Sequence, residues 1–173
     1  MVTRSAVLLR GVNLGRHNRI SMPDLTAVLD GLGCRAVQTY VQSGNAVVEH
    51  DAAPAELERL VAAALAERGL AVPVMVRTGE ELARVVADSP WHDLDPKLFH
   101  VAFLSGEPDP VKVAAIDHAG LAPERVVVGD RVLYLDYALG AGRSKGLDRV
   151  RVGVDATARN WRTVNALRDL AAD

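Results

Sequence analysis

The feature that most constrains this fold is the order of its predicted elements, because one pattern occurs nearly twice along the chain. In residues 1–77, short apolar runs typical of strands alternate with two helical patterns in the order β-α-β-β-α-β. This is the ferredoxin-like order. Ser21 and Pro54 mark the helix starts, and the turn Ser43-Gly44-Asn45 joins the two middle strands as a hairpin.

The second half repeats this pattern incompletely. A capping box at Thr78 starts a linking helix, and the following residues predict the order β-α-β-β-α-α, in which Thr157 caps a last helix and no final strand follows. We therefore predict an α+β protein of two consecutive ferredoxin-like βαββ-type units, the second incomplete and ending in helices. The predicted domains are residues 1–77 and residues 78–173, the second with a glycine-rich basic loop and a C-terminal helix.

Composition excludes several classes of protein. The 173 residues are 49% hydrophobic, which is enough for a packed core and too much for a disordered chain. No apolar run approaches the roughly 20 residues that span a bilayer, and the apolar stretch after Met1 is too short for a signal peptide. Cys34 is the single cysteine, so no internal disulfide forms. These features predict a soluble, cytoplasmic protein with no membrane partner.

Charge is segregated along the chain although the net charge is only -2. Residues 1–40 hold five arginines and two acids, residues 143–168 hold seven Lys/Arg and two acids, and the region between them is acidic. If the two basic segments meet in space, they form one face that attracts anions. The alternative interpretation is a set of solvated surface arginines.

Four polar segments contain the candidate ligand-binding residues. They are the loop after the first strand, the first hairpin turn, the glycine-rich loop at 140–146 and the start of the predicted last helix. Glycines and cations next to a helix start suit an anion, although ordinary turn and loop conformations explain the same residues. The candidates are Arg10, Asn13, Ser43, Asn45, Arg143, Ser144, Lys145, Thr157, Arg159 and Asn160.

Other chemistry has no support in the sequence. The glycine segments match neither the Rossmann nor the Walker pattern, and no histidine pair has the spacing of a zinc helix. No nucleophilic triad or carboxylate pair can be identified from spacing. We therefore predict no cofactor and no metal, and the sequence decides neither whether the protein is an enzyme nor its oligomeric state.

The same segments resemble the signature stretches of the bacterial domain-of-unknown-function family 1697. The resemblance rests on Leu8–Gly15, Thr39–Asn45, Gly140–Lys145 and Thr157–Val164, which occur in order along nearly the whole chain. It implies a two-part α+β protein with ferredoxin-like features. It implies no activity, because none is established for these uncharacterised conserved proteins.

The best functional hypothesis from the sequence is that the protein binds a phosphorylated or otherwise anionic small molecule at a site where the basic segments converge. The bound molecule is then either a ligand or the substrate of a reaction. Oriented cations and backbone amides stabilise phosphoryl groups without a covalent nucleophile. The alternatives are a nucleic-acid-binding or a protein-interaction module. Nucleic acid is disfavoured, because only 4% of residues are aromatic and the net charge is negative.

Overall fold

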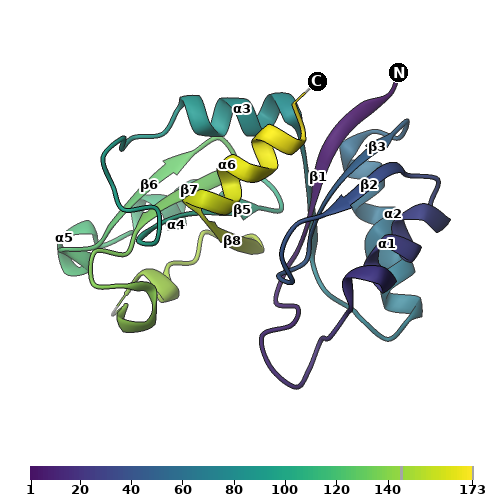
Figure 1. Ribbon diagram of the computed structural model, residues 1–173. Helices are drawn as coiled ribbons and strands as arrows, with labels where there is room; N and C mark the ends of the chain where they lie inside the picture. Colours follow the sequence, from purple (N-terminus) through teal and green to yellow (C-terminus); the bar gives the residue numbers. More distant parts are fainter. Residues whose placement is uncertain (145, 173) are drawn as a thin grey trace. The chain divides into compact units, whose positions relative to one another are not determined.

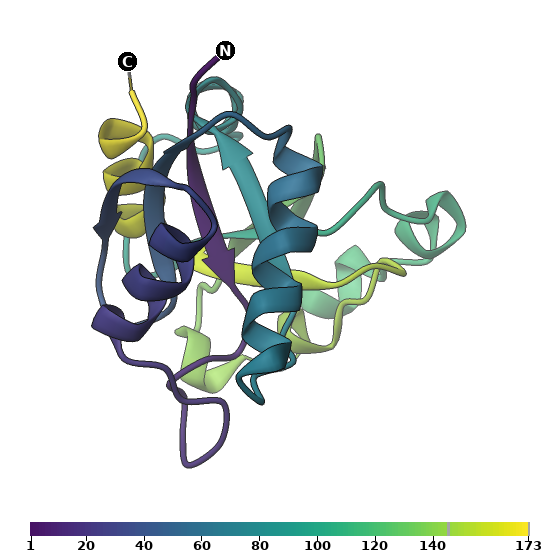
Figure 2. The same ribbon diagram turned by 90° about the vertical axis from the view of Figure 1, so that its right-hand side faces the viewer.

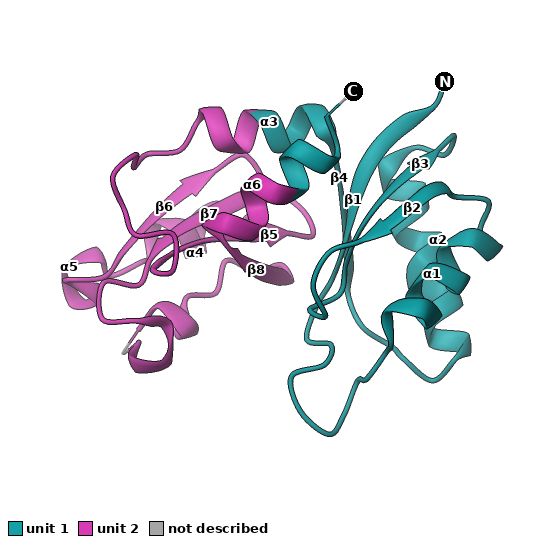
Figure 3. Ribbon diagram, in the orientation of Figure 1, with its two compact units in different colours: residues 1–83, 167–173 teal, residues 84–166 magenta. Residues whose placement is uncertain are grey.

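The computed structural model describes residues 1–144 and 146–172. The chain divides into two compact units, shown in different colours in Figure 3. Unit 1 comprises residues 1–83 together with residues 167–173, and unit 2 comprises residues 84–166. We describe each unit by itself.

Unit 1 is an antiparallel sheet with two helices, Met22–Gly31 and Pro54–Glu67, on one face (Figures 1 and 2). The sheet has four strands in the order β2-β3-β1-β4. Its strands are β1 (Thr3–Leu9), β2 (Arg35–Thr39), β3 (Asn45–His50) and β4 (Val74–Thr78). Its helices are α1 (Met22–Gly31), α2 (Pro54–Glu67) and the first part of α3 (Gly79–Ala87).

The core of unit 1 forms because the apolar positions of α1 and α2 recur at helical spacing. Leu25 and Leu29 of α1, and Leu57, Val61 and Leu65 of α2, are buried against one face of the sheet. The sheet contributes alternate residues of its strands to the same cluster, as expected for side chains that point to opposite faces. The loops that leave this sheet therefore start from well-defined positions.

Unit 2 repeats the strand order of unit 1. Its four antiparallel strands are arranged β6-β7-β5-β8, which is the order β2-β3-β1-β4 with each strand replaced by its counterpart. The strands are β5 (Phe99–Leu104), β6 (Arg125–Gly129), β7 (Val132–Asp136) and β8 (Ala156–Asn160). The other elements are α4 (Pro110–Ala114), α5 (His118–Leu121), 3-10 turns at Ala141–Arg143 and Leu147–Arg149, and α6 (Trp161–Leu170), whose end belongs to unit 1.

The structure confirms the α+β class and the predicted elements of residues 1–77, and it corrects the end of the chain. The second unit does not lack its final strand, because residues 156–160 form β8. This strand pairs with β5 in antiparallel register, with Thr157 opposite Phe103. Asn160 takes the capping position instead, since its side-chain oxygen accepts a hydrogen bond of 2.9 Å from the backbone N–H of Thr163. The prediction that Thr157 caps the last helix is therefore wrong.

Candidate functional site

A single asparagine organises the loop that follows β1 in unit 1. The side-chain amide of Asn13 donates to the carbonyl oxygens of Ile20 and Gln42, both at 2.8 Å, and its oxygen accepts from the N–H of Ile20 at 2.9 Å. These bonds close the loop on itself and tie it to the turn between β2 and β3. Two segments that the sequence analysis selected separately are therefore neighbours.

The turn at 43–44 packs directly on the same loop. The N–H of Leu9 donates to the carbonyl of Gly44 at 2.9 Å. Gly44 has φ +79°, and a Cβ atom there would lie 2.9 Å from the Cβ of Leu9, so only glycine fits. Asn45 is buried, and its amide donates to the Ser43 hydroxyl at 2.8 Å and to the Tyr40 carbonyl at 3.1 Å. Asn45 therefore acts within the turn.

The loop carries cations without any acid between Arg10 and Ser21. We call residues 10–21 the basic loop. Its charged or titratable side chains are all exposed: Arg10, Arg16, His17 and Arg19. Beside it lies a pocket of about 360 Å³ at the start of α1. The pocket is lined by Asn13, Arg19, Ile20, Ser21, Met22, Pro23 and Gln42.

The backbone around this pocket adopts conformations that side chains other than glycine rarely take. Asn13 and Asn18 have φ of 58° and 52°, and Val41 has φ of 47°. Asparagine tolerates this region, but a β-branched residue there is strained. Val41 is also 51% exposed, so burial of its side chain does not offset the strain. Such strain is concentrated at functional sites in other proteins, which supports a ligand role for this surface.

In the glycine-rich loop of unit 2, one candidate side chain is exposed and another is hydrogen-bonded to a buried residue. Arg143 lies exposed on a 3-10 turn, whereas the Ser144 hydroxyl donates to Oε2 of Glu124 at 3.0 Å. Glu124 is only 2% exposed, so this hydroxyl supplies a hydrogen bond to one oxygen of a buried carboxylate. Lys145 lies outside the described residues.

The candidates at residues 157–160 lie on β8 and not on a helix. Arg159 is 7% exposed, and its guanidinium donates to the Thr157 hydroxyl at 2.7 Å and to the Ala158 carbonyl at 2.9 Å. Burial lowers the pKa of Arg159 to about 10. The expectation that Arg159 is an exposed arginine in the first turn of a helix is therefore wrong.

The structure thus brings some of the predicted site residues together in unit 1 and places the others in unit 2. In unit 1 it gathers Arg10, Asn13, Ser43 and Asn45 around one loop and one turn. Arg143, Ser144, Thr157, Arg159 and Asn160 belong to unit 2, and the convergence of all four segments stays a prediction. Sequence reasoning missed Arg19 and Gln42, although the acid-free stretch that ends at Ser21 already contained Arg19.

In residues 1–144 and 146–172, no group of three or more His, Cys, Asp or Glu side chains is placed to hold a metal ion. Among the same residues, the helices are all too short or too polar to cross a bilayer.

The fold defines an α+β protein built from two four-stranded antiparallel sheets of matching strand order, with a basic loop and a pocket in the first unit. The chain belongs to the family described as "Protein of unknown function (DUF1697)", whose model matches residues 2–134. Two of the four signature segments lie in that range, and the segments that begin at Gly140 and Thr157 follow it.

The fold is shared with a solved structure. The chain is similar to a conserved bacterial protein from Streptococcus pneumoniae, with a TM-score of 0.81 and 22% sequence identity over 99% of this chain and 100% of that one. This likeness extends to the fold alone. No curated protein matches the sequence.

Proposed function

We propose that the protein binds a phosphorylated or otherwise anionic small molecule at the basic loop of unit 1. The observation that carries the proposal is the combination of an acid-free cationic loop with a pocket of about 360 Å³ beside it. Pockets of roughly 300–1,000 Å³ are typical of small-molecule sites. Asn13 supports the proposal, because a loop held by three side-chain hydrogen bonds loses little conformational entropy when a ligand binds.

Recognition in this pocket falls mainly to side chains. The start of α1 also faces it, but its backbone donors are largely occupied: the N–H of Asp24 donates to the Ser21 hydroxyl and the N–H of Leu25 to the Ser21 carbonyl. Pro23 has no N–H to offer. Arg19 is therefore the principal anion contact in the proposal, because a guanidinium forms paired hydrogen bonds with phosphate or carboxylate oxygens.

The second basic segment, residues 143–168, remains part of the proposal as a separate source of positive charge for the anion. Arg143 is exposed, and Arg143 and Lys145 are the cations of the glycine-rich loop. Neutralising them tests whether unit 2 takes part in binding the same anion.

A protein-interaction role is the second candidate, and one observation favours it. Leu14 in the basic loop is 82% exposed, and Val41 in the neighbouring turn is 51% exposed. Exposed apolar residues among cations suit a protein partner better than a phosphate. A nucleic-acid role has less support, because Trp91 and Trp161 each pack one part of their ring surface on Phe99 in unit 2.

The test is a thermal-shift titration with inorganic phosphate, AMP and glucose 6-phosphate, with adenosine and glucose as neutral controls. A ligand at a hundred times its dissociation constant stabilises the folded state by about 2.7 kcal/mol. We expect the phosphates to raise the melting temperature and the neutral compounds to leave it unchanged. Arg19→Met should abolish the shift. Arg59→Met is the matched control, since Arg59 pairs with Glu56 on α2, away from the pocket lining.

Three outcomes would contradict the proposal. An unchanged melting temperature with every anion leaves the protein-interaction candidate, whereas a shift that Arg19→Met does not reduce shows that the anion binds outside this pocket. A salt-dependent shift produced only by single-stranded nucleic acid favours the nucleic-acid alternative. A shift that is reduced in Arg19→Met and unaffected in Arg143→Met confines the site to unit 1.

We also propose that the protein works in the cytoplasm. Cys34 is the only cysteine and is a free, buried thiol, and burial raises its pKa. A chain without a disulfide is typical of a reducing compartment. Fractionation of cells that express the protein tests this location.

A further inference from the structure

We propose that unit 2 contains a second binding site, for a ligand with a compact apolar body that ends in one anionic group, such as an acyl or aryl carboxylate or phosphate. The site is a pocket of about 440 Å³ between α4, α5 and the segment that leads to β8. We call it the unit 2 pocket. It is lined by Lys112, Ala115, Ile116, Asp117, Gly120, Leu121, Gly146, Arg149, Val150 and Arg151.

The apolar part of this lining comes from Ala115, Ile116, Leu121 and Val150. Ile116, Leu121 and Val150 are half-buried because they also pack against the hydrophobic core of unit 2. Gly146 lies against Leu121 on this wall, since a Cβ atom there would be 2.5 Å from the Cδ2 atom of Leu121. The apolar surface is thus supported by the core below it, and it suits a hydrocarbon or an aromatic ring.

The charged part of the lining is cationic. It contains Lys112, Arg149 and Arg151 and one carboxylate, Asp117, whose Oδ1 accepts a hydrogen bond of 3.0 Å from the N–H of Gly120. Across the part of the chain that the structure describes, Lys112 and Arg149 form no ion pair. An anionic group of the ligand would supply that missing charge.

The backbone holds one of the three cations in place and lies close to a second. The Lys112 side chain lies over Gly153, where an added Cβ atom would be 3.5 Å from its Cδ and 3.7 Å from its Nζ. Gly153 has φ +89°, a conformation that favours glycine. The Arg151 guanidinium donates through Nη1 to the carbonyls of Asp148 at 2.7 Å and Val150 at 3.0 Å. The two hydrogen bonds of Arg151 reduce the entropy that its side chain loses when an anion binds.

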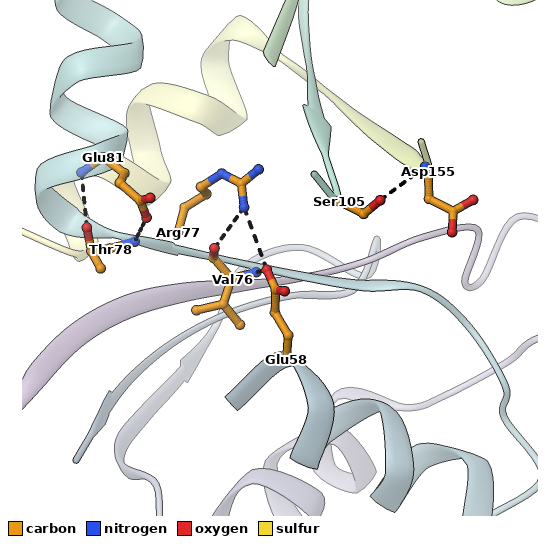
Figure 4. A network of polar contacts seen from close by, with 7 residues as sticks. All are labelled: Glu58, Val76, Arg77, Thr78, Glu81, Ser105 and Asp155. Atoms are coloured by element: carbon orange, nitrogen blue, oxygen red, sulfur yellow. Dashed lines mark hydrogen bonds and ion pairs between the residues drawn. The ribbon is translucent and has the colours of Figure 1, made fainter. Parts of the chain in front are cut away.

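A neighbouring hollow of about 590 Å³ locates the anionic end of the ligand. It is more polar and shares only Lys112 and Arg151 with the unit 2 pocket. Its far wall is formed by Ser105 and Asp155, which are joined by a hydrogen bond of 3.1 Å from the Asp155 N–H to the Ser105 hydroxyl (Figure 4). Because the two hollows meet at Lys112 and Arg151, the anionic group belongs at these two cations, with the apolar body on Ile116 and Leu121.

The test uses the full-length protein and the fluorescent probe 8-anilinonaphthalene-1-sulfonate, an aromatic anion. We expect saturable binding that octanoate and octyl phosphate displace and that octanol does not. The relative potency of octanoate and octyl phosphate identifies the preferred anionic group, and either order supports the site. Lys112→Met with Arg151→Met should weaken probe binding roughly tenfold, as expected for the loss of hydrogen bonds to charged groups.

Two more variants make the result decisive. Ala115→Phe, at an exposed position, fills the pocket while leaving every cation in place, and it should also weaken the probe. Lys97→Met removes an exposed cation of unit 2 outside the pocket lining and should bind like the wild type. The proposal is overturned if octanol competes as well as octanoate, or if the variants in the pocket bind the probe normally. Arg19→Met should leave the probe affinity unchanged, so this site and the one in unit 1 fail independently.

Discussion

At the scale of single residues, polar side chains decide how the loops of unit 1 are held. Asn13 and Asn45 are both asparagines in loop segments, yet each completes the hydrogen bonding of backbone groups that no strand or helix satisfies. A buried carbonyl left without a donor would cost about 1–3 kcal/mol, which is large compared with the net stability of a small domain. These two residues therefore form the framework of the proposed site, for which we propose Arg19 as the source of charge.

His50 is a buried titratable residue of the same unit, and it predicts how stability depends on pH. Its Nε2 lies 3.0 Å from the Ser5 hydroxyl, and burial lowers its pKa below the ordinary 6.5. The Asp51 carboxylate raises the pKa of His50 and the Arg35 guanidinium lowers it, each by less than burial does. Below about pH 6.5 the unfolded chain therefore binds a proton that the folded chain resists, and stability falls as the pH falls.

We expect the free energy of unfolding, measured with urea, to decrease between about pH 7 and pH 5, and to decrease less in His50→Gln. His100 contributes in the same direction, because burial lowers its pKa as well, so some pH dependence remains in the variant. His92→Gln, at an exposed position, is the control and should follow the wild type. An equal pH dependence in His50→Gln and the wild type would refute the assignment.

At the scale of elements, the two units match most closely where the last strand of each sheet runs into a helix. Arg77 in β4 pairs with Ala6 of β1, and Arg159 in β8 pairs with Val101 of β5. Both arginines are buried, and the next residue begins the helix cap in each case. In unit 1, Thr78 accepts from the N–H of Glu81 at 3.1 Å, and the Glu81 carboxylate accepts from the N–H of Thr78 at 2.8 Å (Figure 4).

The corrected boundary between β8 and α6 predicts the effect of changing Asn160. Asn160→Ala removes the capping acceptor for the Thr163 N–H and should lower the free energy of unfolding by about 1 kcal/mol. Asn160→Asp keeps an acceptor at the start of the helix and should retain most of the stability. Urea unfolding monitored by circular dichroism measures both. Equal stability of Asn160→Ala and the wild type would contradict the cap.

At the scale of the whole molecule, the C-terminal end of the chain belongs to the same unit as its N-terminal part. The end of α6 belongs to unit 1, where Leu167 and Ala171 are buried and the Arg4 guanidinium donates to the Ala172 carbonyl at 3.0 Å. Gly79, the first residue of α3, lies so close to this segment that a Cβ atom there would collide with the Ala171 carbonyl oxygen. The position therefore requires glycine for steric reasons.

This contact predicts opposite effects for two helical glycines. Glycine to alanine in a helix ordinarily stabilises by roughly 0.5–1 kcal/mol. Gly31→Ala, near the end of α1, meets no atom within 4 Å and should follow that rule. Gly79→Ala should instead lower the free energy of unfolding by about 1–3 kcal/mol, because backbone must move to admit the methyl group. A stabilised Gly79→Ala variant in thermal unfolding would show that the end of the chain is not docked there.

The sequence by itself determined the elements whose signals are local. The apolar spacing of α1 and α2, the Thr78 capping box and the hairpin turns depend on neighbouring residues, and the structure contains them all. The basic loop was also visible in the sequence, because an absence of acids between Arg10 and Ser21 is a local property.

Only the tertiary structure decided the features that depend on pairing between distant segments. Residues 157–160 have the local signals of a helix start. They form a strand because they pair with β5, and hydrogen bonding along the sheet edge satisfies backbone groups that a helix cap leaves without partners. The same pairing buries Arg159, which local charge patterns place at the surface. Asn13 could not be assigned as the anchor of its loop either, because one of its partners, the Gln42 carbonyl, comes from another turn that lies beside it only after the sheet has formed.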